Sequence, residues 1–152
     1  MTNEIRKRLH CLYFEYDTER YPFKALIEEF MGVELGSLHN WLGDYKVFTR
    51  EVDQMTLPHR VFYANFEKHL APVYKDFIKH VIRPAVAAPF YYQVKPTFRI
   101  GLPGNKFVGE YHKDGDYHHK DYEVNFNLGL ANYGGPASLQ VEKEEGSGDF
   151  GW

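Results

Sequence analysis

Apolar side chains recur every three or four residues between Leu57 and Ile82. The stripe consists of Phe62, Phe66, Leu70, Val73, Phe77 and Val81. This spacing places them on one face, so the pattern predicts a long helix packed on the core. Because Pro72 lacks an N–H and clashes with the preceding turn, we expect it to kink or split this helix. We expect Arg83-Pro84 to close the segment.

A second helical pattern runs from Glu19 to Met31, and Gly32 follows it as a stop signal. Its apolar positions are Phe23, Leu26, Ile27 and Phe30. A short helix is predicted to start at Ser37, whose hydroxyl can cap it, and to end at Gly43. The first half of the chain, residues 1–85, is therefore expected to be mainly helical.

The periodicity changes to two in the second half of the chain. Residues 122–130 alternate most clearly, with apolar Tyr122, Val124, Phe126, Leu128 and Leu130 on one face and Glu123, Asn125 and Asn127 on the other. Further strands are predicted over 90–100, 106–112 and 138–142, with Gly- and Pro-rich turns between them. Helices followed by strands that look antiparallel indicate an α+β fold, in which residues 86–152 form the sheet part.

Composition narrows the class of protein. The chain has 152 residues and a net charge of −3, and we expect residues 1–152 to form a single domain. No Lys/Arg run stands out, so no nucleic-acid partner is expected. Cys11 is the one cysteine, which excludes a disulfide framework and favours a cytoplasmic location. No stretch approaches the ~18 apolar residues of a membrane span, so no membrane association is expected.

Histidine and aspartate are crowded between His112 and His119, just after a predicted strand. The spacing fits neither a calcium-binding EF-hand loop nor the HExxH motif of zinc proteases. His112 and Asp114 are two positions apart, so on an extended backbone both side chains project to the same face. One imidazole and one carboxylate are two of the three ligands in a facial Fe(II) site, which leaves positions open for O₂ and a cosubstrate. A polar turn without a metal is the alternative interpretation of this pair.

The run from Phe98 to Phe150 resembles the first part of the jelly-roll core of Fe(II)/2-oxoglutarate-dependent oxygenases. The shared pattern is an Arg-bearing strand, then Tyr-His-x-Asp-x-x-Tyr-x-His from Tyr111, then Glu-x-Asn-Phe from Glu123, then a strand leading to Val-Glu. Within that family it is most similar to the group related to streptomycin-biosynthesis and phytanoyl-CoA-hydroxylase-like enzymes. The resemblance implies N-terminal helices packed on an antiparallel double-stranded β-helix, truncated after its first strands.

The resemblance also implies roles for individual residues. His112 and Asp114 would bind the iron as catalytic ligands, and His118, His119 or a histidine from elsewhere would complete the set. Residues that would line the cavity for the cosubstrate 2-oxoglutarate are Arg99, Tyr111, Asn125 and Asn127, with Glu123 and Tyr117 nearby. The expected reaction is the hydroxylation of a small or peptide-like substrate.

The chain departs from the family pattern after Asp114. No histidine follows His119 and no arginine follows Arg99, whereas the family has a second histidine and an Arg or Lys that pairs with 2-oxoglutarate. We therefore expect this segment to be inactive alone and to leave open sheet edges that a second copy or another chain could pair with. Two other functions stay open: a non-catalytic binding or assembly module, and a cupin-like metal-dependent enzyme that uses His112, Asp114 and His118 or His119.

Overall fold

The computed structural model describes residues 2–10, 12–41, 49, 51–102, 112, 120, 122–132, 134, 139–144 and 146–149. Its α-helices are α1 (Asn3–Leu9), α2 (Phe23–Met31), α3 (Leu57–Asn65), α4 (Ala71–Phe77) and α5 (Arg83–Val86). A 3₁₀-helix, η1 (Leu35–Trp41), and two π-helical stretches, η2 (Phe66–Leu70) and η3 (Ile78–Ile82), complete the described elements.

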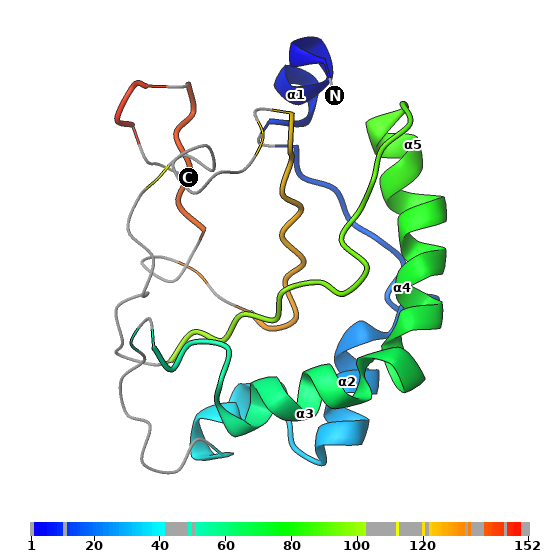
Figure 1. Cartoon of the computed structure of the whole chain (residues 1–152), viewed down its shortest axis with the longest axis vertical. Coiled ribbons are helices and arrows are strands. Elements are labelled where there is room, and N and C mark those ends of the chain that lie inside the picture. The colour runs from blue at the N-terminus through cyan, green and yellow to red at the C-terminus, as the bar shows by residue number, and fades with distance from the viewer. Residues whose placement is uncertain are drawn as a thin grey trace.

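The predicted long helix is present, and it bends. The elements α3, η2, α4, η3 and α5 follow one another without a break, and the chain turns sharply between α3 and α4 (Figure 1). Each π-helical stretch ends two residues before a proline, Pro72 or Pro84. The N–H groups of Ala71 and Arg83, which precede these prolines, bond to carbonyls five residues back instead of four.

The wider π turns explain how the helix tolerates its prolines. A proline ring clashes with the carbonyl four residues before it, and a π turn moves that carbonyl away. The prediction of a kink at Pro72 is thus confirmed, whereas the prediction that Pro84 closes the helix is wrong. The helix continues to Val86 and ends at Ala87, whose φ of 53° is left-handed.

The π turns also shift the buried face. Phe62, Phe66 and Phe77 of the predicted stripe are buried, but the next buried position is Ile82 rather than Val81. A π turn contains about one residue more than an α turn. The next side chain on the buried face therefore lies five residues after Phe77, at Ile82. The core that this face forms joins α2, η1, the α3–α5 segment and Phe98.

Helix α2 follows its sequence signals closely. It begins at Phe23, later than the apolar pattern suggested, and ends at Gly32, whose φ of 67° is the left-handed conformation that favours glycine. The next helix is a 3₁₀-helix that starts at Leu35, before the predicted cap Ser37. No described helix has both the length and the apolar composition needed to cross a membrane.

The prediction of an α+β jelly roll is wrong. Residues 90–100, 122–130 and 139–142 are described and contain no β-strand, so the described part of the chain is helical with extended connections. The segment that follows α5 instead packs along the helices, and its backbone bonds to their side chains: Tyr74 donates to the carbonyl of Gln93 at 2.8 Å. Open sheet edges are accordingly absent from the described residues, and most of the predicted strand 106–112 lies outside them.

Helix α1 was not predicted, and it ties the two ends of the described chain to the helical core. Thr2 caps it by accepting the N–H of Ile5 at 3.3 Å. The Arg8 guanidinium donates to the carbonyls of Ala85 at 2.9 Å and Val86 at 2.8 Å, at the C-terminal end of α5. His10 Nε2 lies 3.0 Å from the carbonyl of Glu142, so the C-terminal segment is held near α1.

Candidate functional site

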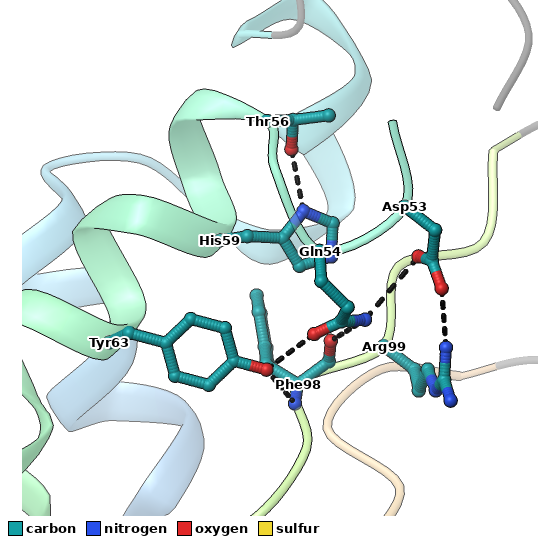
Figure 2. A network of polar contacts seen from close by, with 7 residues as sticks. All are labelled: Asp53, Gln54, Thr56, His59, Tyr63, Phe98 and Arg99. Atoms are coloured by element: carbon teal, nitrogen blue, oxygen red, sulfur yellow. Dashed lines mark hydrogen bonds and ion pairs between the residues drawn. The ribbon is translucent and has the colours of Figure 1, made fainter. Parts of the chain in front are cut away.

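Figure 2 shows a polar network where the turn at 51–55, helix α3 and the extended segment at 98–99 meet. The Tyr63 hydroxyl donates to the side-chain oxygen of Gln54 and accepts the backbone N–H of Phe98 at 3.1 Å. The Gln54 amide nitrogen donates to the Phe98 carbonyl at 2.8 Å. Both backbone polar groups of Phe98 are therefore bonded to side chains and not to a neighbouring strand.

Gln54 is held in a left-handed backbone conformation, with φ at 66°. That conformation costs a residue with a Cβ about 1–2 kcal/mol, so the surrounding bonds must stabilise it. Besides its bonds to Tyr63 and Phe98, its amide nitrogen donates to Asp53 Oδ1 at 3.3 Å. The turn at 51–55 is thus fixed by side-chain bonds to α3 and to residue 98.

Arg99 joins this network through an ion pair with Asp53. The two side chains differ in exposure: 13% of Asp53 and 55% of Arg99 are accessible to solvent. Asp53 Oδ1 faces Gln54 and Oδ2 faces Arg99, so both carboxylate oxygens have donors. The Arg99 side chain is thus more than half exposed, whereas the carboxylate that pairs with it is largely shielded from solvent.

A buried histidine lies beside this pair. Thr56 and His59 are fully buried at the start of α3, and Thr56 Oγ1 lies 2.6 Å from His59 Nδ1. Burial lowers the pKa of His59, an effect that nearby Asp53 opposes and Arg99 reinforces. The His59 imidazole is therefore neutral at neutral pH.

The structure brings one of the predicted site residues, Arg99, into this network. His112, Asn125 and Asn127 are described and exposed, at other places on the chain. Tyr111 and Asp114 lie outside the described residues, as do Tyr117, His118 and His119. Within 122–130, Asn125 and Asn127 face solvent, and Val124, Leu128 and Leu130 pack in part against the core, but Tyr122 and Phe126 of the predicted apolar face are exposed.

A facial iron site needs three ligand side chains that converge on one point. Within the described ranges, no three His, Cys, Asp or Glu side chains are grouped so that they could hold a metal ion. Of the predicted ligand pair, His112 belongs to the described part and is exposed. The described residues therefore do not supply an iron site, and the expectation of Fe(II) and 2-oxoglutarate depends on the sequence motif.

Sequence analysis missed most members of the network, namely Asp53, Gln54, Thr56, His59 and Tyr63. One signal was present. Thr56 is a residue type that favours the N-cap position and it does precede α3, although its hydroxyl bonds to the His59 ring and makes no cap bond to the helix backbone. Gln54 carried no such signal, because its partner Phe98 is 44 positions away in the sequence.

A second charged cluster lies around Asp76 on α4. Its carboxylate accepts from Arg20 at 3.0 Å and lies 3.3 Å from His80 Nε2. Burial raises the pKa of Asp76, but the hydrogen bond from Arg20 and the charge of His80 outweigh that effect and leave the pKa below its usual value. These side chains are about half exposed, so the cluster is an ordinary surface ion network.

Comparison with known proteins finds similarity to a biosynthetic protein. The chain is 35% identical over 136 residues to the streptomycin biosynthesis protein StrG of Streptomyces griseus. The match covers 90% of this chain and 66% of that protein, so the chain spans just under two thirds of its relative's length. No family model matches the chain. No solved structure matches it either. The similarity agrees with the streptomycin-biosynthesis part of the sequence resemblance, and the relative's name states no reaction.

Proposed function

We propose that this chain acts in the biosynthesis of a small natural product as an Fe(II)/2-oxoglutarate-dependent, oxygenase-like protein. The observation that carries the proposal is the motif His112-x-Asp114 in a chain that is similar to a streptomycin biosynthesis protein. His112 and Asp114 would hold Fe(II), and the remaining iron positions would take the cosubstrate and O₂. The substrate would be a small hydroxylatable molecule in the cytoplasm, and neither a nucleic acid nor a membrane.

The proposal does not include a jelly roll, since the described residues have none. In its place, the helical face formed by α3 and segment 98–99 would support the cosubstrate side of the site through Arg99. Tyr111, Asn125 and Asn127 are the other residues proposed for that side. Bound iron and 2-oxoglutarate would together supply the oxidising chemistry, and the role of these side chains is to bind and orient.

Anaerobic Fe(II) titration of the purified chain tests the ligand assignment. We expect Asp114→Ala and His112→Ala each to weaken Fe(II) binding at least tenfold, because each removes a direct ligand. His39→Ala is the matched control, since His39 is an exposed histidine on η1, and it should bind iron like the wild type. Unchanged iron affinity in Asp114→Ala contradicts the proposal. Binding of another metal, with no spectral change on adding 2-oxoglutarate, favours the cupin-like alternative.

A non-catalytic binding module is the second candidate. It is favoured by exposed apolar side chains on the segment after α5, where Tyr91 is fully exposed and Val94 is 65% exposed. Exposed apolar residues that lie close together are typical of surfaces that contact partners. A chain that binds no metal, yet co-purifies with a defined partner released by Tyr91→Ser, would support this function instead.

A further inference from the structure

Three basic residues form a row on the outer face of the helix that runs from α4 to α5. Lys75, Lys79 and Arg83 follow one another at intervals of four residues, and all three are exposed. Side chains four residues apart lie on the same face of a helix, about 6 Å apart along its axis. The buried positions of this stretch include Phe77 and Ile82, so the row faces away from the core. Helices α4 and α5 lie along one edge of the molecule (Figure 1), where a partner can reach the row.

The positive charge of this row is not neutralised within the part of the chain that the structure describes. There, none of its three members takes part in an ion pair. Asp76 is the one acidic residue in the sequence between positions 71 and 86, and its carboxylate is bound by Arg20 at 3.0 Å and lies 3.3 Å from His80. The whole chain has a net charge of −3, so the positive charge is a local property of this surface.

The row does not stabilise the helix that carries it. Like charges four residues apart repel one another and destabilise a helix. The C-terminal end of a helix favours cations, but this effect is confined to the last turn. Lys75 and Lys79 lie before the last turn, because the helix ends at Val86. A negatively charged partner on the row would therefore remove a repulsion that the fold leaves uncompensated.

The surroundings of the row favour a protein partner over a nucleic acid or a membrane. Proteins bind single-stranded nucleic acids with aromatic rings that stack on the bases, and interfacial helices insert apolar side chains into a membrane. Between positions 71 and 86, all of which are described, no large apolar side chain is exposed. The phosphates along one strand of a duplex are about 3.4 Å apart, roughly half the spacing of the row. Carboxylates at every fourth position of a second helix have the same spacing of about 6 Å as the row.

We propose that Lys75, Lys79 and Arg83 form a docking surface for an acidic helix of a partner protein, which carries carboxylates at every fourth position of one face. The two helices would lie side by side, so that each cation of the row meets one carboxylate. Contacts between exposed charges are screened by salt and accelerate association more than they tighten binding. The inference goes beyond the proposed function, since it involves neither iron nor any residue proposed to bind it.

The test is an NMR titration of the purified chain with synthetic alanine-rich helical peptides at pH 7 and low ionic strength, following the backbone amides of residues 75–83. The first peptide carries three glutamates at every fourth position, and the second carries the same three glutamates on different faces. We expect saturable binding of the first peptide and about fivefold weaker binding of the second, whose carboxylates cannot meet the row together. A third peptide, with glutamines in place of the glutamates, should not bind, and added NaCl should weaken binding of the first.

Two variants that lose the same charge separate the row from the net charge of the chain. Lys75→Gln/Lys79→Gln should bind the first peptide about fivefold more weakly than the wild type. Arg6→Gln/Lys7→Gln is the matched control, since it removes two exposed basic residues from α1 and should bind the peptide like the wild type. The charge-reversed variant Lys75→Glu/Lys79→Glu should instead bind a peptide with three lysines at every fourth position. If Lys75→Gln/Lys79→Gln fails to fold, Lys79→Gln decides, and peptide binding as tight as that of the wild type would overturn the inference.

Several outcomes would overturn the docking surface. They are the absence of saturable binding of the first peptide by the wild type, equal losses in the two glutamine variants, and equal binding of the first two peptides. An oligothymidylate with three phosphates and vesicles that contain phosphatidylserine are titrated in parallel and should bind more weakly than the first peptide. Tighter binding of either one through the row would assign the row to a nucleic acid or a membrane and overturn the inference. Fe(II) binding by Lys75→Gln/Lys79→Gln should equal that of the wild type, so the iron proposal and the docking surface fail separately.

Discussion

The Phe98 backbone N–H donates to the Tyr63 hydroxyl at 3.1 Å, although the two residues are 35 positions apart. The same hydroxyl donates to Gln54, so one oxygen joins the turn at 51–55, helix α3 and the extended segment at 98–99. The Phe98 ring stacks on the Phe62 ring from the same helix, with centroids 4.4 Å apart and planes 8° apart. Polar and apolar contacts thus fix the same backbone position, next to Arg99.

Replacing Tyr63 with Phe removes both hydrogen bonds of that hydroxyl and keeps the ring. We expect Tyr63→Phe to lower the free energy of unfolding by about 2 kcal/mol, because the N–H of Phe98 and the side-chain oxygen of Gln54 lose their partner in a partly buried place. Urea denaturation measures the change. Tyr74→Phe is the matched control: it removes one exposed bond, to the Gln93 carbonyl, and should cost about 0.5 kcal/mol. Equal losses in the two variants would show that the network around Gln54 adds no stability of its own.

Substitutions at Gly32 and Gly36 test whether α2 ends in a left-handed conformation at Gly32. An added Cβ meets no atom within 4 Å at either position, and Gly32 alone of the two has a left-handed φ, 67°. We expect Gly32→Ala to destabilise the protein by about 1–2 kcal/mol for conformational reasons. Gly36→Ala should be neutral or stabilising by up to about 1 kcal/mol, since it stiffens the unfolded chain. Thermal unfolding of both variants measures the difference, and a Gly32→Ala protein as stable as the wild type would contradict the assigned helix end.

The helical half of the fold was readable from sequence because its signals are local. Apolar spacing located the helix from Leu57, and Pro72 located its bend. The two π turns could not be predicted from the sequence. Each forms because the backbone must avoid the clash with a proline ring and still keep its apolar side chains in the core. One extra residue in η3 then moved the buried position from Val81 to Ile82.

The strands were predicted wrongly for a physical reason that residues 122–130 make clear. Their alternation survives in part: Val124, Leu128 and Leu130 contact the core while Asn125 and Asn127 are exposed, but Tyr122 and Phe126 are exposed as well. Alternation of apolar and polar residues indicates an extended backbone. It does not indicate whether that backbone is hydrogen-bonded to another strand, because side chains alternate in both cases. Pairing depends on where the backbone bonds go, and at Phe98 they go to Tyr63 and Gln54. The site shows the same limit, because the ion pair between Arg99 and the distant Asp53 could not be predicted from local sequence signals.

His59 predicts a pH dependence of stability with a definite sign. Burial holds its pKa below the unfolded value of about 6.5, so the unfolded chain takes up a proton first as the pH falls. As the pH falls below about 7, His59 should therefore lower the free energy of unfolding, and this loss should stop once the pH is below the pKa of His59 in the folded protein. Above pH 7, His59 should make no contribution that depends on pH. Urea midpoints at several pH values should show a weaker acid loss in His59→Gln than in the wild type. The two proteins differ in this histidine alone, so an unchanged pH profile would contradict a buried neutral imidazole at position 59.

Arg8 caps the C-terminal end of α5, although the carbonyls that it binds are 77 and 78 positions away in the sequence. Its guanidinium donates to the carbonyls of Ala85 and Val86, which lie at the helix end and lack an intrahelical donor. Its positive charge also interacts favourably with the negative end of the helix dipole. We expect Arg8→Ala to cost about 1 kcal/mol, because these bonds are charge-assisted but partly exposed. Hydrogen exchange should locate the loss at the amide of Ala87, which bonds to Arg83 at 2.9 Å in the last turn of α5. Lys7→Ala removes a neighbouring charge from the exposed face of α1 and should change stability by less than about 0.5 kcal/mol. If both variants speed exchange at Ala87 equally, the effect comes from the charge of α1, and the carbonyl contacts of Arg8 do not hold the helix end.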